Sequence, residues 1–177
     1  MTDPDAGAAS VHASAVLVVN RAVLIRGPSG AGKSRLAFDL ILAGRAGQIP
    51  HSVLVGDDRV RLGASNGQLV VRPVRELAGL IEIRGLGIRR CDFAEEAIVG
   101  LVVDLSASDA ARLPLPEALL TRICGVKIPR TPVGAGYSAL PLVIAALTMT
   151  ESSDSAQPSA DCSKGFGNHI SPTIATK

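Results

Sequence analysis

The feature that most constrains this chain is a glycine-rich segment, Gly27-Pro28-Ser29-Gly30-Ala31-Gly32-Lys33-Ser34. It fits in full the pattern of a phosphate-binding loop (P-loop). Glycines let backbone N–H groups converge on phosphate oxygens, the lysine adds a positive charge for the β- and γ-phosphates, and the serine hydroxyl can ligate Mg²⁺. By chance the pattern arises in only about one per cent of chains of this size. The segment therefore predicts binding of a nucleoside triphosphate, foremost Mg-ATP.

The residues on both sides of the P-loop predict a strand before it and a helix after it. Residues 15–26 (AVLVVNRAVLIR) contain two apolar runs around Asn20-Arg21, which is typical of a hairpin or a strand pair. After the loop, apolar side chains recur with a helical period at Leu36, Ala37, Leu40 and Ile41. Gly44 stands where the C-cap of this helix would be. A helix that starts near Lys33 points the positive end of its dipole at bound phosphates.

The rest of the chain alternates apolar runs and turn residues as α/β domains do. The expected elements are strands at 51–58, 97–105 and 122–129, a hairpin turning at 63–67, a short helical piece followed by a glycine-punctuated segment within 74–90, and a helix over 137–149. The run at 97–105 is apolar throughout, as in a strand at the centre of a sheet. Pro141 fits the last helix only within its first turn. The predicted fold class is α/β, a P-loop-containing single domain with a mixed sheet.

A change in composition predicts the domain limits. The 177 residues, 47% of them hydrophobic, suit one compact domain. We expect a flexible N-terminus over 1–10 and a P-loop catalytic domain over 11–150. Residues 151–177 are rich in Ser, Ala, Gly and Pro and lack periodicity, so we expect a disordered tail.

Composition also excludes several classes of partner. Aromatic residues make up 2% of the chain and the net charge is +2. Both values argue against a nucleic-acid partner, because binding to nucleic acids relies on aromatic stacking and on clustered positive charge. No apolar run reaches about 18 residues, and the start MTDPDAGAAS does not resemble a secretory signal, so we expect a cytoplasmic protein without a membrane segment. The three cysteines lack any metal-type spacing.

Asp57-Asp58 follows the predicted strand 51–58, at the sheet edge where α/β proteins place ligand-handling groups. One carboxylate there can hold Mg²⁺, and the other could accept a proton from an attacking hydroxyl. A solvated polar turn at the end of a strand is the alternative, and the presence of the P-loop favours the functional interpretation.

Glu82 and Arg84, within Glu82-Ile83-Arg84-Gly85-Leu86-Gly87, lie two residues apart on an extended stretch. Their side chains would point to the same side, so they could form an ion pair or share a phosphate or metal site. An ordinary glycine turn explains the same residues equally well.

Three segments, taken in order, resemble one known family. GPSGAGKS, VGDDRV and IEIRGLGI look like the catalytic domain of HPr kinase/phosphorylase, and IEIRGLGI is close to a signature that P-loop enzymes at large do not share. The resemblance covers about His12 to Leu147 and is to the short form of the family. It implies a fold related to phosphoenolpyruvate carboxykinase and assembly as a hexamer. It also implies an enzyme that uses ATP and Mg²⁺ to phosphorylate a serine of the phosphocarrier protein HPr, and can remove that phosphate by phosphorolysis.

The resemblance implies a role for each matching residue. The P-loop would cradle the nucleotide phosphates, with Lys33 on the β- and γ-phosphates and Arg84 beside them. Asp57 would be the base that deprotonates the target serine, and in reverse the acid that reprotonates it. The groups around Mg²⁺ would be Ser34, Asp58 and Glu82. His12 falls where the family has a histidine ahead of the first strand, although a surface histidine near a chain end fits it as well on chemistry alone.

Two departures from the family pattern concern the site. Gly56 stands where the family usually has alanine before the two aspartates. The family's late loop carries Arg-Pro-Gly-Arg-Asn, whereas here Ile128-Pro129 is followed by RTPVGAG, so that Arg130 would replace one arginine and the second has no counterpart. An arginine near a transferring phosphoryl group stabilises its spread negative charge, and its loss counts in particular against phosphorolysis.

Two alternatives to a protein kinase stay open. A small-molecule or nucleotide kinase shares the P-loop, but such enzymes usually carry an arginine-rich lid that this sequence does not show. A nucleotide-sensing regulatory module without catalysis is compatible with the altered late loop.

Overall fold

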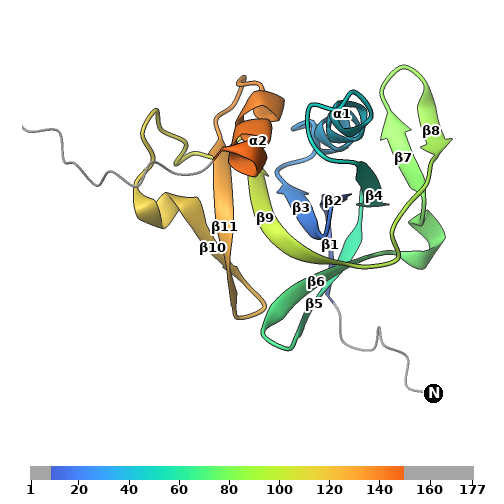
Figure 1. Cartoon of the computed structure of the whole chain (residues 1–177), viewed down its shortest axis with the longest axis horizontal. Helices are drawn as coiled ribbons and strands as arrows, with labels where there is room; N and C mark the ends of the chain where they lie inside the picture. Colours follow the sequence, from blue (N-terminus) through green and yellow to red (C-terminus); the bar gives the residue numbers. More distant parts are fainter. Residues whose placement is uncertain (1–8, 150–177) are drawn as a thin grey trace, which may run out of the picture.

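The computed structural model describes residues 9–149, and the expected flexible start (apart from Ala9 and Ser10, which belong to the first strand) and the expected tail lie outside this range. Strands, two α-helices and two short 3-10 turns make up the domain (Figure 1). In chain order these are β1 (Ala9–Val11), β2 (Ser14–Val18), β3 (Arg21–Arg26), α1 (Lys33–Arg45), β4 (Ser52–Gly56), β5 (Val60–Ser65), β6 (Gln68–Pro73), η1 (Arg75–Leu77), β7 (Leu80–Ile83), β8 (Gly87–Arg90), β9 (Ala97–Leu105), η2 (Pro116–Leu119), β10 (Leu120–Ile123), β11 (Val126–Val133) and α2 (Ala139–Thr148).

One mixed sheet carries the fold, in the order β1-β5-β6-β9-β3-β2-β4, with β11 pairing to β9 and β10 to β11. β9 is parallel to both β3 and β11, whereas β2 is antiparallel to both β3 and β4. β3, β4, β9 and β11 therefore run in the same direction, and their carboxyl ends meet at one edge of the sheet. The P-loop and Asp57-Asp58 both begin at this edge, because they follow β3 and β4. The predicted mixed α/β fold and the central place of residues 97–105 are confirmed.

The central strands are apolar throughout because both of their faces are buried. On β3, Val23 and Ile25 join the cluster that contains Leu36 and Leu40 of α1. The alternate residue Leu24 joins a second cluster on the opposite face, together with Leu69 and Val71 of β6. Figure 1 shows the reason: the sheet curls, so that β5 and β6 pass under the strands that α1 covers from the other side.

Two predicted hairpins form; the first turns one residue earlier than expected, and the second has a tighter turn than expected. β2 and β3 pair around Val19-Asn20, and β5 and β6 pair around Asn66-Gly67. Asn66 and Gly67 have φ of 50° and 74°, the left-handed conformation that two-residue hairpin turns require.

The expected single strand at 122–129 is wrong. The segment is a hairpin in which β10 pairs antiparallel with β11. Cys124 and Gly125 form its turn, with φ of 48° and 79°. The sequence pattern hid this turn because cysteine rarely occupies the left-handed region, and only Gly125 marks it.

The two helices follow their predictions except at one glycine. α2 has Ser138 as its N-cap and holds Pro141 within its first turn, as expected. α1 begins at Lys33, but it continues through Gly44 to Arg45, and Ala46 is the C-cap. The prediction that Gly44 is the C-cap is therefore wrong. No helix within residues 9–149 is long and apolar enough to cross a membrane.

Glycine occupies position 44 of α1 because the helix packs closely on β4 there. This close contact can be tested by adding a methyl group. A Cβ at Gly44 would lie 2.8 Å from Ser52 Oγ and 2.9 Å from Ser52 N. Alanine improves helix propensity by about 1 kcal/mol, but overpacking against a fixed strand costs about 1–3 kcal/mol. The net effect is a loss of about 0–2 kcal/mol, so we expect Gly44→Ala to lower the free energy of unfolding by about 1 kcal/mol in urea titrations.

Gly63 supplies the matched control, because no atom lies within 4 Å of its Cβ position. We expect Gly63→Ala to change the free energy of unfolding by less than about 0.5 kcal/mol. Equal effects of the two substitutions would mean that the contact with Ser52 is not what selects glycine.

Candidate nucleotide-binding and phosphoryl-transfer site

The P-loop bends sharply between the end of β3 and the start of α1. Gly30 and Gly32 have φ of 78° and 97°, in the left-handed region that favours glycine, and Gly32 is the N-cap of α1. Glycine is required at position 27 for a different reason. A Cβ there would lie 3.0 Å from both Cβ and the backbone O of Leu105, at the end of β9. The loop thus packs against the neighbouring strand and leads directly into a helix N-terminus, where backbone N–H groups attract anions.

Lys33 is held over this loop rather than extended into solvent. Its side chain is buried, with 5% of the residue exposed, and Nζ donates hydrogen bonds of 3.0 Å to the backbone oxygens of Gly27 and Pro28. An ammonium group has three donors, and neutral carbonyls leave its charge uncompensated. A cation is therefore fixed at the place where the loop amides and the helix dipole already favour negative charge.

Asp57 is the best-anchored carboxylate of the site. It follows β4, is only 3% exposed, and accepts hydrogen bonds from Ser14 Oγ at 2.5 Å and from the backbone N–H of Glu82 at 3.0 Å. These donors come from the start of β2 and from β7, so three elements fix the carboxylate. Both donors are uncharged, and Asp57 forms no ion pair within residues 9–149. A buried carboxylate without a counter-ion can accept a proton from a hydroxyl group.

Asp58 and His12 form a second, exposed pair next to Asp57. Asp58 adopts a left-handed φ of 64°, a conformation that aspartate tolerates. Its Oδ1 lies 3.4 Å from Nε2 of His12, which precedes β2. The sequence-predicted residues His12, Asp57 and Asp58 are therefore brought together.

Glu82 and Arg84 both lie on the hairpin formed by β7 and β8, which the short turn around Gly85 closes. Both side chains are exposed. They form no ion pair with each other, so that interpretation of the motif is wrong. The backbone of Glu82 contacts Asp57, which places this hairpin beside the predicted base.

Ser34, the remaining predicted site residue, lies in the first turn of α1, and its hydroxyl forms no hydrogen bond to Asp58 or Glu82 within the described chain. No group of three or more His, Cys, Asp or Glu side chains that could hold a metal ion gathers among residues 9–149. Ser34, Asp58 and Glu82 thus lie on separate elements, in α1, after β4 and in β7.

A network of two arginines and two aspartates, which the sequence analysis missed, braces the same edge of the sheet. Arg26, the residue before the P-loop, donates to both carboxylate oxygens of Asp104 at 2.7 Å each. Arg130 donates to Asp104 through Nε at 2.5 Å and to both oxygens of Asp109 at 2.6 and 2.9 Å. The one signal in the sequence is a charged residue, Asp104, inside an apolar strand.

The ion pairs of this network shift the pKa values of its members. Burial raises the pKa of Asp104, but hydrogen bonds from Arg26 and Arg130 and their positive charges outweigh it, so its pKa lies below the ordinary value. The hydrogen bonds that Arg130 donates to Asp109 and Asp104 raise the pKa of its guanidinium group. Both groups therefore stay ionised at neutral pH.

Arg130 cannot serve as the late-loop arginine in this arrangement. Its guanidinium group is shared among Asp104, Asp109 and the backbone oxygen of Ala118. The loop after β11 carries Gly134, Ala135 and Gly136 instead. The expectation that Arg130 replaces a family arginine finds no support in its contacts.

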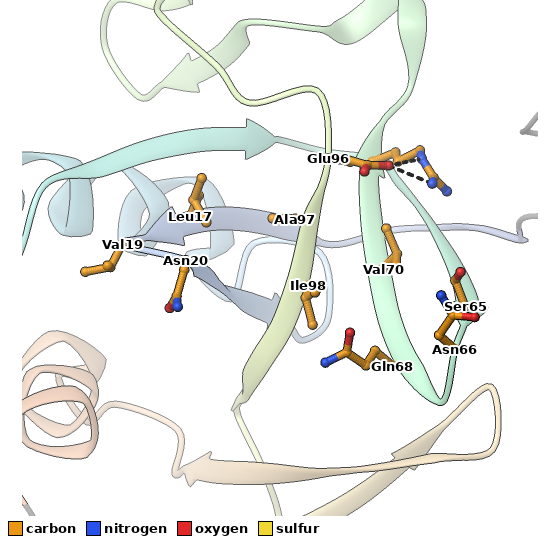
Figure 2. Close-up of a pocket in the computed structure, with 11 residues that line it drawn as sticks. Leu17, Val19, Asn20, Ser65, Asn66, Gln68, Val70, Glu96, Ala97 and Ile98 are labelled. Carbon is orange, nitrogen blue, oxygen red and sulfur yellow. Dashed lines mark hydrogen bonds and ion pairs between the residues drawn. The ribbon is translucent and has the colours of Figure 1, made fainter.

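One hollow of the surface lies elsewhere and is a poor candidate for the site. Figure 2 shows it between the β2–β3 turn, the β5–β6 hairpin and the start of β9. Its volume is about 420 Å³, and Asn20, Asn66, Gln68 and Glu96 are among its lining residues. The start of β9 is at the sheet edge opposite to the P-loop, so this hollow is remote from the phosphate-binding chemistry.

Comparisons with known proteins point to one family. The family described as "HPr Serine kinase C-terminal domain" matches residues 6–161. HPr kinase/phosphorylase of Mycoplasma mycoides subsp. mycoides SC is 31% identical over 165 residues, which cover 84% of this chain and 50% of that protein. The enzyme of the same name from Enterococcus faecalis is 44% identical over 80 residues, or 45% of this chain and 24% of that one. This chain therefore spans half or less of the length of these curated relatives.

A solved structure shares the fold. The Hpr(Ser) kinase/phosphatase from Coxiella burnetii superposes with a TM-score of 0.61 at 27% sequence identity, over 78% of this chain and 93% of that one. The predicted fold class is confirmed at the level of the whole domain.

The network around Asp104 leads to a prediction about stability and pH. Asp104→Asn leaves Arg26 and Arg130 without their shared counter-ion in a partly buried place, so we expect a loss of about 3 kcal/mol in the free energy of unfolding at pH 7. Because the folded-state pKa is lowered, the stabilisation is present above the unfolded pKa, about 3.9, and is lost as pH falls through the folded pKa. The difference between the two proteins should therefore shrink below about pH 4.

Urea titrations at several pH values measure this difference. Glu96→Gln, which breaks the exposed pair with Arg72, is the control and should cost less than about 1 kcal/mol. A difference between wild type and Asp104→Asn that stays constant from pH 7 to pH 3 would contradict the proposed role of the ion pairs.

Proposed function

Because this chain belongs to the family of the HPr serine kinase C-terminal domain, we propose that it is an ATP-dependent protein-serine kinase acting on an HPr-like phosphocarrier protein in the cytoplasm. The observation that carries the proposal is the pairing of a fixed cation with a fixed, cation-free carboxylate at one edge of the sheet. Lys33 lies at the end of the P-loop that follows β3, and Asp57 follows β4. These two strands run in the same direction, with the antiparallel β2 between them. In-line transfer of a phosphoryl group to a hydroxyl needs these two groups.

In the proposed reaction the P-loop binds the phosphates of ATP. Lys33 exchanges its contacts with the carbonyls of Gly27 and Pro28 for oxygens of the β- and γ-phosphates, and Arg84 lies beside them. The amides of the loop and of the first turn of α1 supply the remaining donors. Binding in this manner positions the γ-phosphorus at the edge of the sheet that carries Asp57.

Asp57 then acts on the acceptor serine. It takes the proton of the hydroxyl as the serine oxygen bonds to the γ-phosphorus, while the bond between that phosphorus and the β,γ-bridging oxygen breaks and ADP leaves. Ser14 and the N–H of Glu82 hold the carboxylate in one orientation during this step. In phosphorolysis an oxygen of inorganic phosphate would bond to the phosphorus of the phosphoserine while the bond from that phosphorus to the serine oxygen breaks and pyrophosphate forms. Asp57, having taken a proton from the attacking phosphate, would give it to the serine oxygen.

The oxygen donors of Ser34, Asp58 and Glu82 fit Mg²⁺, which prefers a few hard protein ligands together with phosphate oxygens and water. When bound, the ion neutralises charge on the β- and γ-phosphates. His12 would orient Asp58 through the 3.4 Å contact between them.

The proposal also includes assembly of this chain into a hexamer. Analytical ultracentrifugation tests this part of the proposal by measuring the mass of the assembly.

A second candidate function rests on the engagement of Arg130. Because no arginine of the late loop reaches toward the phosphates, the domain could bind ATP and signal its level without transfer. Incubation with γ-labelled ATP and HPr distinguishes the two functions: label on a serine of HPr supports the kinase, and ATP binding without transfer supports the sensor.

Removal of the P-loop cation gives a prediction about binding. We expect Lys33→Ala to weaken Mg-ATP binding at least about 100-fold in calorimetry, because a charge-assisted contact in a buried site is lost. Lys127→Ala removes an exposed lysine of β11 and should leave the affinity unchanged. Undiminished binding by Lys33→Ala would show that the nucleotide does not use this loop.

Substitution of Asp57 separates binding from transfer. We expect Asp57→Asn to retain Mg-ATP affinity within about threefold and to lose at least about 1,000-fold in the rate of transfer, because an amide cannot accept the serine proton. Asp39→Asn, which alters an exposed pair with Arg35 on α1, should leave the rate unchanged. Full transfer by Asp57→Asn would exclude Asp57 as the base.

A further inference from the structure

We propose that the hairpin of β7 and β8 is the surface on which the acceptor protein docks, through an apolar patch flanked by acidic side chains on that protein. This inference rests on the proposed kinase function and adds to it a docking site and the chemistry of the partner's surface. The surface consists of the outer face and tip of the hairpin, Leu86, Ile88 and Arg90.

The register of the hairpin places these side chains beside the proposed site. Residues that are directly opposite in an antiparallel pair share one face of the sheet. Ile88 is opposite Glu82, and Arg90 is opposite Leu80, so Ile88 and Arg90 lie on the face that carries Glu82. The alternate residue Ile81 is buried against the main core, which fixes the orientation of the hairpin.

Two large apolar side chains on this surface are exposed. Leu86 is 59% exposed and Ile88 is 66% exposed, although the domain buries most of its large aliphatic residues. All four residues of β8 are exposed, and within the described chain β8 pairs only with β7. In Figure 1 the hairpin projects from the molecule next to α1, away from β10 and β11. Exposed apolar residues with arginines among them are typical of protein interfaces.

The charge of the hairpin indicates what kind of partner fits. Residues 84–90 contain three arginines, Arg84, Arg89 and Arg90, and no acidic residue. None of the three forms an ion pair with a carboxylate of residues 9–149, and the one hydrogen bond of Arg89 goes to the backbone oxygen of Ile88. Arg26, Arg72 and Arg130, by contrast, each bind a carboxylate. Arg89 is opposite Ile81 and so lies on the other face of the hairpin, which leaves Arg90 on the docking face and Arg84 next to the turn. Uncompensated guanidinium groups beside apolar side chains are complementary to a surface of apolar and acidic residues.

The surface belongs to the hairpin that holds the proposed base, and it borders a second hollow. The N–H of Glu82, the residue across from Ile88, donates directly to Asp57, so the hairpin that carries this face contacts that carboxylate. At the base of the hairpin a hollow of about 500 Å³ is lined by Gly79, Arg90, Cys91, Asp92 and Phe93. It extends the docking surface and can receive a side chain of the partner.

A different explanation is that the arginines only protect the free edge of β8 from pairing with other strands. The experiment decides between the two. We would measure transfer from ATP to HPr by wild type, Ile88→Ser, Arg90→Glu and Arg90→Lys, and determine kcat and KM for HPr at several salt concentrations. Matched controls are Leu113→Ser and Arg112→Glu, exposed residues of the segment that joins β9 to β10 on the other side of the molecule.

We expect Ile88→Ser and Arg90→Glu each to raise KM for HPr about tenfold, with kcat and Mg-ATP affinity within about twofold of wild type. Arg90→Lys should retain a KM near that of wild type, and Arg90→Glu should lose most of the increase of KM with salt. The two control variants should leave KM unchanged.

Three outcomes overturn the proposal. An unchanged KM in Ile88→Ser and Arg90→Glu would mean that the arginines protect the edge and that the acceptor docks elsewhere, while the kinase function stands. A KM raised equally by the control variants would show that the effect is not local to the hairpin. Absence of any transfer by wild type that binds Mg-ATP would refute the kinase function, and the docking site with it.

Discussion

The convergence of two arginines on Asp104 is the interaction on which the geometry of this domain depends. β9 lies between β3 and β11, and Arg26 and Arg130 reach Asp104 from these two strands. The ion pairs therefore tie together the ends of three parallel strands at the point where the P-loop begins. Desolvation makes such a network costly, but once it is formed, loss of one member leaves a charge without a partner. Leu105, the next residue, packs on Gly27, so the position of the loop follows from that of the strands.

Two aspartates at this edge of the sheet have different hydrogen-bond partners. The partners of Asp104 are charged and suit a structural role, whereas those of Asp57 are uncharged and suit the proposed role as a base. Asp104 is bound by guanidinium groups, which lower its pKa and make it a poor base. Asp57 is equally constrained, but by a hydroxyl and a backbone N–H, which orient the carboxylate without cancelling its charge. A base needs a fixed direction and an available lone pair, and only the second arrangement provides both. In the mechanism proposed above, Ser14 would be a positioning residue, since it acts through its hydrogen bond to Asp57.

Local patterns predicted the parts of this structure that local interactions determine. The P-loop, the start of α1 and the turn at Asn66-Gly67 depend on neighbouring residues, and all were predictable. The contact between Ser14 and Asp57 joins residues 43 apart, and the pair of Arg26 and Asp104 joins residues 78 apart. Such contacts depend on strand order and register, which no short pattern contains. Gly44 shows the same limit. Glycine is required at this position because a Cβ would clash with Ser52 on another element, whereas the local pattern indicated only that the helix was near its end.

The positions of the lysine and arginine side chains near the site affect the two proposed reactions, transfer from ATP and phosphorolysis, differently. Arg130 is bound to Asp104 and Asp109, and the loop after β11 offers glycine and alanine. In the proposed reaction the positive charge on a transferring phosphoryl group would therefore come from Lys33 and Arg84. Transfer from ATP brings both reacting phosphates in one ligand that the P-loop already holds. Phosphorolysis must bring two separate anions, inorganic phosphate and a phosphoserine, to the same place, and their mutual repulsion requires more positive charge than transfer to a neutral hydroxyl. With the late-loop cation engaged elsewhere, the arrangement favours the kinase direction over its reversal.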